Sequence, residues 1–450
     1  MSTDRILHVC IGEAALEVGI LWLSSQGGRS FSAFQYSDKW LRNPRAFSIA
    51  PALPLSDSKR FFHGDPQDPH SSSLPPPLAD TLPDLWGRRL LRKAGQTTHD
   101  LDGFALLVAV DDFSRIGALR LLDPNTQAFL APVQTGHLRI PPVVEIHNLV
   151  QDIHRIESDH PDRESLQRLL GGGSSLGGAR PKCTVRRENG QLAIAKFTSR
   201  FDTHPVEKAE VLAIRLARLC GLATPDVQLL ESQGFPVALI DRFDRHGQSR
   251  VPYLSAQSFL GLPSAVAGTY IEYADHLRQY SGNVAMDLRE LFARVSFSIL
   301  ITNTDDHLKN HALLHDGERG WRLSPIFDVN PAPERERRLK TAIADPEEPS
   351  ASIDLLIDHA EFFDLAKDDA VSLIVHQAER IGRNWRRIAS ECRMTRSEIR
   401  DYEPAFVHGE ASRAAQLDVA QIPGDHGRAS SGQAHGLSHS SSAARRRKKP

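Results

Sequence analysis

Three polar residues carry the strongest chemical signal in this sequence: Asp305, Asn310 and Asp328. The first two lie in ITNTDDHLKN, and Asp328 follows the strand-like segment LSPIF. In phosphoryl transfer, an Asp accepts the proton of the attacking hydroxyl, and an Asn at this spacing binds Mg²⁺. Carboxylate and amide oxygens suit Mg²⁺, which keeps several waters and takes further ligands from substrate phosphates. The alternative is that TDDH is a polar turn that caps a helix, where Asp and Asn are also common.

Three features further upstream occur in the order that protein kinases use. The segment GGGSSLGGARPK, residues 171–182, is rich in glycine, which lets backbone N–H groups approach phosphates. Lys196 lies in the alternating segment AIAKF and could pair with the phosphates of ATP. Glu210, on the helical segment VEKAEVLAIRLA, would hold Lys196, and Glu207 is its rival one turn away. Taken singly, these features also fit a flexible turn, an edge-strand lysine and a solvated helical glutamate.

Length and composition indicate a soluble globular protein of two or three domains. The 450 residues are 40% hydrophobic and 24% charged, and the net charge of -2 indicates neither a nucleic-acid nor a membrane surface. The 4 cysteines show no paired spacing, which is typical of a reducing cytoplasm rather than of disulfides or zinc. The N-terminus does not resemble a signal peptide, and no apolar run is long enough to span a bilayer.

The chain divides into four segments by pattern. Residues 1–140 begin with strand-like ILHVCI, LEVGILWL and SFSAFQY and predict an α+β subdomain. Residues 141–262 follow the order glycine loop, strand, helix and two strands, which is typical of a small nucleotide-binding lobe. Residues 263–409 are dominated by amphipathic helices, which predict an all-helical catalytic lobe. Residues 410–450 have little apolar surface and end in ARRRKKP, so a disordered basic tail is expected.

Several of these segments resemble the signature motifs of the HipA family of serine/threonine kinases, toxins of bacterial type II toxin–antitoxin systems. The motifs are SSLGGARPK, IAKF, LIDRFDR, NTDDHLKN and SPIFDVNP, with LPDLWGRRLL and VDDFSRIGALR in the N-terminal part. The resemblance covers about residues 5–405 and leaves out the tail. It implies a two-lobed, protein-kinase-like α+β fold with an N-terminal subdomain.

Carried over by position, the resemblance assigns roles to individual residues. Asp305 becomes the general base, Asn310 and Asp328 the Mg²⁺ ligands, and Ser175, beside Ser174, the autophosphorylated serine of the glycine-rich loop. The residues implied to contact ATP are Gly177, Gly178, Ala179, Arg180, Pro181, Lys182, Lys196, Leu239, Ile240, Asp241, His307, Leu308, Lys309, Asn310, Phe327 and Asp328.

The resemblance also implies partners. These are a HipB-like helix-turn-helix antitoxin that contacts DNA on behalf of the complex, and a protein substrate such as an aminoacyl-tRNA synthetase. The rival hypotheses are a small-molecule phosphotransferase, because the same lobes serve such enzymes, and a non-catalytic co-repressor subunit. A hydrolase that binds metal through Asp305, Asp306 and His307 would need further ligands at matching spacing, which the sequence does not offer.

Overall fold

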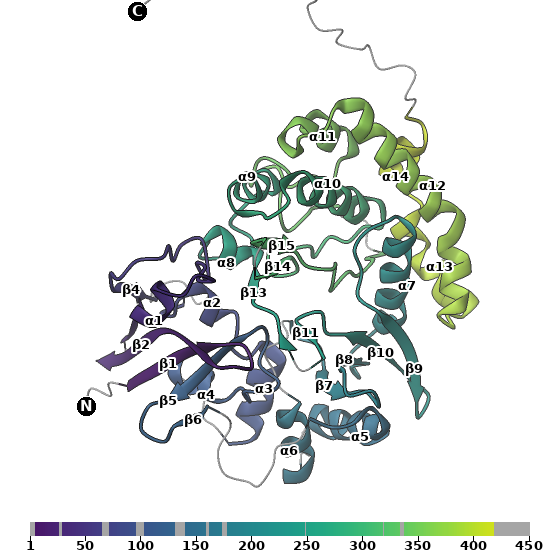
Figure 1. Ribbon diagram of the computed structural model, residues 1–450. Coiled ribbons are helices and arrows are strands. Elements are labelled where there is room, and N and C mark those ends of the chain that lie inside the picture. Colours follow the sequence, from purple (N-terminus) through teal and green to yellow (C-terminus); the bar gives the residue numbers. More distant parts are fainter. Residues whose placement is uncertain are drawn as a thin grey trace, which may run out of the picture.

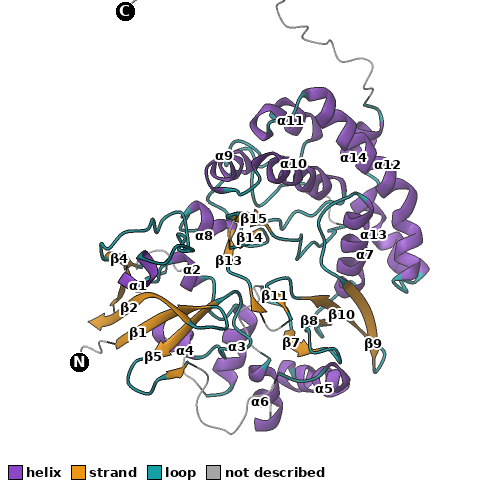
Figure 2. Cartoon of the chain, viewed as in Figure 1, coloured by secondary structure: helices purple, strands orange, loops and turns teal. Residues whose placement is uncertain are grey.

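The fold is described from a computed structural model. It describes residues 5–26, 29–64, 72–95, 103–130, 140–158, 162–172, 178–247, 249–317, 319–333 and 337–417. Three bodies lie against one another: an N-terminal sheet, a small lobe with its own sheet, and a large lobe made mainly of helices (Figure 1). Coloured by secondary structure, the strands gather in the first two bodies and the long helices in the third (Figure 2).

The N-terminal body is built on a six-stranded sheet in the order β4-β3-β2-β1-β5-β6, and its neighbouring strands are antiparallel. The three predicted N-terminal strands are β1, β2 and β3. Side chains alternate across a strand, so Leu7, Val9 and Leu21 lie fully inside the core. The strands are β1 (Arg5–Ile11), β2 (Leu16–Gln26), β3 (Arg29–Tyr36), β4 (Arg60–His63), β5 (Leu119–Asp123) and β6 (Ala128–Phe129). The helices are α1 (Asp38–Leu41), α2 (Pro76–Ala79), α3 (Leu85–Lys93) and α4 (Gly103–Val108).

The small lobe is an antiparallel sheet in the order β7-β8-β10-β9. On one face, Ala195, Phe197 and Leu239 pack in a core with α3, α5 and α6. On the other face, Lys196 and Ile240 line a pocket, and α7 packs on β9 and β10. The elements are η2 (Val143–Glu145), α5 (Ile146–Glu157), α6 (Arg163–Gly171), β7 (Lys182–Arg186), β8 (Leu192–Phe197), α7 (Val206–Leu219), β9 (Val227–Ser232) and β10 (Phe235–Asp241).

The large lobe surrounds the buried helix α10, whose second half is apolar on nearly all sides, as its sequence predicts. Between the helices lies the three-stranded sheet β13-β14-β15, which adds strands to a lobe expected to be all helical. The mixed α+β fold class with a mainly helical C-terminal lobe is confirmed. The elements are β11 (Arg245–His246), β12 (Ser249–Arg250), β13 (Tyr253–Ser255), α8 (Ala256–Leu260), α9 (Tyr270–Tyr280), α10 (Val284–Leu300), β14 (Ala312–His315), β15 (Trp321–Leu323), α11 (Ile353–Asp358), η3 (Ala360–Phe363), α12 (Lys367–Glu391), α13 (Arg396–Phe406) and α14 (Gly409–Ala415).

The start of the predicted disordered tail at residue 410 is wrong, because helix α14 continues the lobe beyond it. Glu410 accepts a hydrogen bond from the backbone N–H of Ile353, and Arg413 forms an ion pair with Asp354. Ala414 is fully buried in the main core. The composition of this segment is poor in apolar residues, but long-range contacts with α11 and α12 hold it in place. The rest of the predicted tail, from residue 418, lies outside the described residues.

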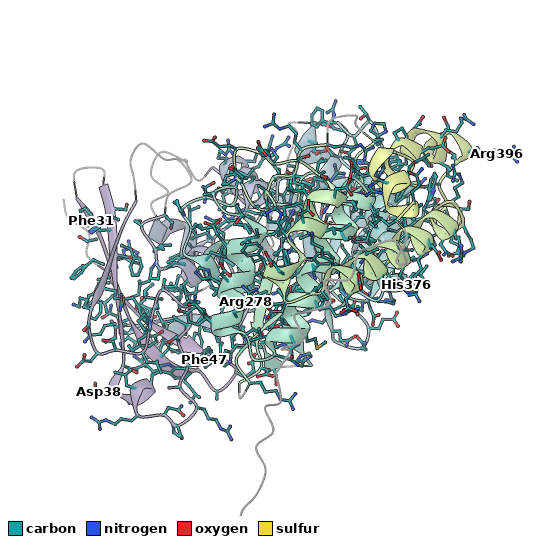
Figure 3. All side chains as sticks on the ribbon, turned by 90° about the horizontal axis from the view of Figure 1, so that it is seen from above. Phe31, Asp38, Phe47, Arg278, His376 and Arg396 are labelled. Carbon is teal, nitrogen blue, oxygen red and sulfur yellow. The ribbon has the colours of Figure 1, made fainter. Side chains whose placement is uncertain are left out.

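The N-terminal body also contacts the large lobe. Phe47 stacks on His315 with ring centroids 3.6 Å apart. In the view from above, Phe47 lies on the side of the N-terminal body that faces the helix bearing Arg278, while His376 and Arg396 are at the far end (Figure 3). Asp80, at the end of α2, accepts hydrogen bonds from Ser255 at the start of α8. The N-terminal body therefore touches the large lobe as well as the small lobe, against which α3 packs.

Within the described ranges, no helix has the length and apolar character needed to cross a membrane.

Candidate active site

The Lys196 ammonium lies between two carboxylates. Its Nζ is 2.6 Å from Glu210 Oε1 and 2.8 Å from Asp328 Oδ1. Burial opposes the charge on Lys196, but Asp328 and Glu210 outweigh it and raise the pKa of Lys196 above its ordinary value. Burial likewise favours the neutral acid at Asp328, but Lys196 and Lys182 outweigh it and lower the pKa of Asp328. Residues from β8, α7 and the loop after β15 thus meet at one cation.

The structure places Glu210, not Glu207, against Lys196. Glu207 Oε1 instead accepts a hydrogen bond of 2.7 Å from Arg180 Nη2, and its Oε2 accepts one of 3.0 Å from Thr198 Oγ1. The Arg180 guanidinium also binds Asp202, with Nη1 2.6 Å from Oδ1. Because these carboxylates hold the side chain of Arg180, the ATP contact predicted for this residue would have to come from its backbone. Glu207 therefore fixes the end of the glycine-rich segment to α7.

The described part of the glycine-rich loop lies directly over the site. Gly178 has φ +89°, a conformation that side chains rarely adopt. A Cβ added there would be 2.8 Å from Lys182 Nζ and 4.0 Å from Asp328 Oδ2. The Pro181 carbonyl accepts a hydrogen bond from Phe197 N on β8, which ties the loop to the sheet, and Ala179 is exposed. Ser174, Ser175 and Gly177 lie outside the described residues, so the predictions for them are untested.

The loop after α10 presents Asp305 to solvent and folds back on itself. His307 N donates to the Asp305 carbonyl at 3.0 Å, and Asn310 N donates to the His307 carbonyl at 2.7 Å. Asn310 Nδ2 also donates to the Asp305 carbonyl, at 3.1 Å, which leaves its side-chain oxygen as an acceptor. Leu308 is fully buried and Lys309 is exposed, so only the second of these two has a side chain open to solvent. The loop geometry therefore fixes Asn310 relative to the Asp305 backbone.

Asp306 supports this loop from below. Its carboxylate accepts hydrogen bonds from Ser298 Oγ and Tyr270 OH, at 2.7 and 2.9 Å, and lies 2.9 Å from His311 Nε2. Burial would raise the pKa of Asp306, but His311 and the two hydroxyl donors outweigh it and lower the pKa. Asp306 is a fully hydrogen-bonded group of the core. Its partners argue against a role for it as a metal ligand beside Asp305.

Asp328 sits on a strained turn that is joined to the Asp305 loop. Its φ of +54° is unusual for a residue with a side chain. Asn330 N donates to Asn303 Oδ1 at 3.1 Å, and Asn330 Nδ2 donates to Asp328 Oδ1 at 3.3 Å. Asn310 and Asp328 offer an amide oxygen and a carboxylate from two loops that contact one another. These donors fit Mg²⁺, which prefers oxygen ligands and needs few from the protein.

A pocket opens beside these residues. Its empty space, which includes open solvent at the mouth, is about 590 Å³. Ile240, Asp241 and Phe327, three of the residues predicted to contact ATP, line it. Phe243 packs against Phe327 with ring centroids 5.4 Å apart, which provides an aromatic wall. Leu239 faces the opposite core, so a contact from Leu239 to ATP would come from its backbone.

The pocket also includes residues that the sequence analysis did not identify: Ile116, Ile194, Arg242, Asp244 and Tyr253. Two of them, Arg242 and Asp244, follow the hinge, the segment 239–241 between the two lobes, and are part of the motif LIDRFDR. No pattern in the sequence marks Ile116 as a pocket residue, because it reaches the pocket through the packing of the N-terminal body against the hinge.

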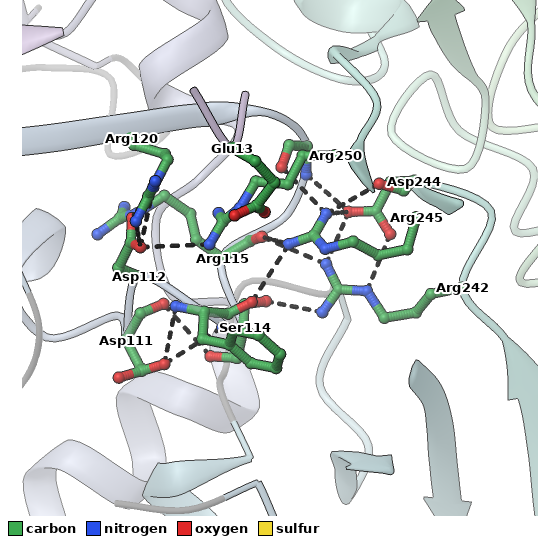
Figure 4. Close-up of polar contacts among 12 residues, drawn as sticks. Glu13, Asp111, Asp112, Ser114, Arg115, Arg120, Arg242, Asp244, Arg245 and Arg250 are labelled. Carbon is green, nitrogen blue, oxygen red and sulfur yellow. Dashed lines mark hydrogen bonds and ion pairs between the residues drawn. The ribbon is translucent and has the colours of Figure 1, made fainter. Parts of the chain in front are cut away.

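A buried charge cluster joins the N-terminal body to the hinge (Figure 4). Asp244 Oδ2 accepts from Gly117 N at 2.7 Å and from Arg242 and Arg245, at 2.7 and 2.6 Å. The same two arginines donate to the carbonyl of Arg115, and Arg242 also donates to that of Ser114. The turn that carries Ile116 is thus bound on both sides by residues that follow β10.

This cluster predicts an acid-sensitive interface. Burial favours protonated Asp244, but Arg242 and Arg245 outweigh it and lower its pKa below 3.8, its ordinary value. A lowered acid pKa stabilises the fold above the ordinary value, and the stabilisation is lost as pH falls. We expect Asp244→Asn to reduce the free energy of unfolding at pH 7 by about 3–5 kcal/mol, since two buried arginines lose their counter-ion.

The difference between wild type and Asp244→Asn should shrink as pH falls below about 4, the ordinary pKa of an aspartate. Urea unfolding at pH 7 and pH 3 measures it. Asp369→Asn, at an exposed position of α12, is the control and should behave as wild type at both pH values. Equal destabilisation by Asp244→Asn at both pH values would contradict the prediction.

Comparison with known proteins places the chain in a family. Residues 7–122 match the HipA N-terminal domain, and residues 174–395 match the HipA-like C-terminal domain. HipA of Shewanella oneidensis MR-1, solved with HipB and its operator DNA, superposes with a TM-score of 0.64. The match covers 92% of this chain and 100% of that one at 17% identity, which shows a shared fold.

Curated relatives of this chain are also kinases by name. Y4mE of Sinorhizobium fredii, a kinase by name, is 26% identical over 318 residues, or 66% of this chain and 71% of that protein. A protein of Haemophilus influenzae, also a kinase by name, is 26% identical over 143 residues, or 28% of this chain and 42% of that protein. The two family matches together span most of the chain and include most of the glycine-rich loop, Lys196, Asp305, Asn310 and Asp328. With both the N-terminal and the C-terminal domain of that family present, the chain belongs to the HipA family.

Proposed function

We propose that this chain is an ATP- and Mg²⁺-dependent serine/threonine protein kinase that acts as a HipA-type toxin. The observation that carries the proposal is the meeting of Lys196 with Glu210 and Asp328 beneath Gly178. A lysine held by a helical glutamate beside a metal-binding aspartate is the arrangement that phosphoryl transfer from ATP requires. The HipA family and the kinase-named relatives support a kinase in general.

In this proposal, each group has a defined task. The adenine lies in the pocket beside Ile240 and Phe327, and Lys196 binds the α- and β-phosphates. Asn310 and Asp328 would hold Mg²⁺, which neutralises charge on the phosphates when it is bound. The serine or threonine oxygen of the substrate attacks the γ-phosphorus and gives its proton to the Asp305 carboxylate. The bond from the γ-phosphorus to the bridging oxygen breaks, and ADP leaves with the electron pair.

The partners follow from the family. A HipB-like helix-turn-helix antitoxin would bind the chain and contact DNA, and HipA of Shewanella oneidensis MR-1 is solved in a complex with HipB and operator DNA. The protein substrate would be a translation component such as an aminoacyl-tRNA synthetase, and the reaction would take place in the cytoplasm. Autophosphorylation would fall on Ser175 or its neighbour Ser174 in the glycine-rich loop.

The test begins with calorimetry of Mg-ATP binding, followed by incubation of the protein with labelled ATP and a cell extract. We expect label on a protein band and a mass increase of one phosphate on the chain, which is lost in Ser175→Ala if Ser175 is the site and in Ser174→Ala if Ser174 is. Label on a small solute alone would favour a small-molecule phosphotransferase. Absence of Mg-ATP binding would favour a non-catalytic co-repressor and would refute the kinase.

The position of Gly178 gives a further prediction. We expect Gly178→Ala to weaken Mg-ATP binding about tenfold, because a residue with a Cβ at positive φ costs about 1–2 kcal/mol and the methyl group would press on Lys182 Nζ. Gly190→Ala is the matched control, since Gly190 has φ +83° with nothing within 4 Å of an added Cβ. Calorimetry on both variants measures the difference. Equal losses of affinity in the two variants would show that the loop does not lie over the phosphates.

A further inference from the structure

The side chain of Asp84 makes two contacts that require different chemistry. Its Oδ1 accepts a hydrogen bond of 2.7 Å from Gly87 N and so caps the start of α3. Its Oδ2 lies 3.3 Å from the ammonium of Lys182 at the end of the glycine-rich loop. Both side chains are 4% exposed, so this ion pair is shielded from solvent. Asp84 belongs to the N-terminal domain, outside the matched catalytic segment.

The first turn of α3 also holds the backbone of the loop. Trp86, which is 1% exposed, donates from Nε1 to the carbonyl of Lys182 at 3.0 Å. Its backbone N–H donates to the carbonyl of Gly178 at 3.4 Å. The N-terminal domain therefore contacts both ends of the described loop segment, residues 178–182, with α3 beside β7 (Figure 1).

Lys182 connects Asp84 to the phosphate site. A Cβ on Gly178 would be 2.8 Å from Lys182 Nζ and 4.0 Å from Asp328 Oδ2, so the ammonium and the carboxylate both lie close to Gly178. Burial raises the pKa of Asp328, and Lys196 and then Lys182 lower it, so the charge of Lys182 is felt at this carboxylate. The Asp84 carboxylate thus sets the position of a cation that faces the metal-binding Asp328.

We propose that Asp84 is a positioning residue for the nucleotide phosphates, which acts through Lys182 and makes the N-terminal domain part of the ATP site. The proposal rests on the proposed function. Helix capping alone does not require a carboxylate here: Ser37, Ser255 and Thr395 cap other helices with neutral hydroxyls. The ion pair with Lys182 is the contact that needs the charge.

Asp84→Asn separates the two roles, because Asn caps a helix as well as Asp but carries no charge. We expect Mg-ATP to bind about tenfold more weakly to the variant, the loss typical of one charge-assisted hydrogen bond. Adenosine, which has no phosphates, should bind as it does to wild type. Because the variant leaves the buried Lys182 without this carboxylate, its melting temperature should fall, and both affinities are measured well below that temperature. Calorimetry with each ligand measures the two affinities.

Asp162→Asn is the matched control. Asp162 caps α6 through Ser165 N at 2.7 Å, the same bond that Asp84 makes to Gly87. We expect this variant to bind both ligands as wild type does. Asp84→Ser, another neutral cap, repeats the test if the Asn variant is unstable.

A double-variant cycle tests the route through Lys182. If Asp84 acts through this lysine, Asp84→Asn should cause no further loss in a Lys182→Met background. Full additivity, unchanged or tighter Mg-ATP binding by Asp84→Asn, or an equal loss for adenosine would each overturn the proposal. A wild-type protein that binds adenosine but not Mg-ATP would instead refute the proposed function, and this role with it.

Discussion

Replacing Asp305 by Asn is expected to abolish phosphoryl transfer while Mg-ATP binding persists. A general base contributes about 10²–10⁴-fold to rate, and the Asn side chain cannot take up the proton. Asp305 is exposed, and its backbone carbonyl, not its side chain, accepts the bonds from His307 N and Asn310 Nδ2. The loop should therefore keep its shape in the variant.

Single-turnover assays with labelled ATP give the rate, and calorimetry gives the affinity. Asp368→Asn, an exposed change on α12, should transfer phosphate at the wild-type rate. A wild-type rate in Asp305→Asn would remove Asp305 as the base. A loss of rate that is matched by an equal loss of Mg-ATP affinity would assign Asp305 to binding instead of proton transfer.

Replacing Lys196 by Met should remove both nucleotide binding and much of the stability of the small lobe. Glu210 is 2% exposed, and it would lose the cation that lies 2.6 Å away. Leaving a buried charge without its partner costs about 3–5 kcal/mol. Burial already raises the pKa of Glu210, and without Lys196 the neighbouring carboxylates Asp328 and Glu207 would raise it further.

The pH dependence of this loss has a definite sign. A folded-state acid pKa above the unfolded value destabilises the fold at high pH, and the destabilisation shrinks as pH falls. We therefore expect the deficit of Lys196→Met, measured by urea unfolding, to be smaller at pH 5 than at pH 8. Lys367→Met, which removes an exposed ion pair with Asp358, should cost less than about 1 kcal/mol. A deficit that grows on acidification would contradict the coupling of Lys196 to Glu210.

The sequence predicts which polar side chains come together better than it predicts what surrounds them. The order of Lys196, Asp305, Asn310 and Asp328 along the chain was enough to expect a shared site, and the structure joins Lys196 to Asp328 and the Asn310 loop to the Asp328 loop. Helix α7, Val206–Leu219, contains the segment VEKAEVLAIRLA that was expected to be helical. Strong local signals of this kind survive in the fold.

The remaining features depend on contacts between distant segments, which no local pattern contains. Glu207 and Glu210 are one turn apart on the same helix, and only the position of Arg180 decides which one binds Lys196. Asp84 and Ile116 belong to segments that precede the glycine-rich loop by many residues. Helix α14 has a weak apolar pattern and is held by Ile353 and Asp354. Tertiary packing overrides composition at each of these positions.

The double attachment of the N-terminal body restricts how the nucleotide cleft can open. That body is bound to the small lobe by Asp84 and by the carbonyls around Arg115, and to the large lobe by Phe47 and Asp80. Because the N-terminal body is attached to both lobes, the lobes can move apart only if one set of these contacts gives way. The contacts with the large lobe are a ring stack and hydrogen bonds from Ser255 to Asp80, which cost less to break than the buried ion pairs of Asp84 and Asp244. When the cleft opens, the N-terminal sheet should therefore move together with the small lobe. A partner that binds both this sheet and the large lobe would fix how far the cleft is open.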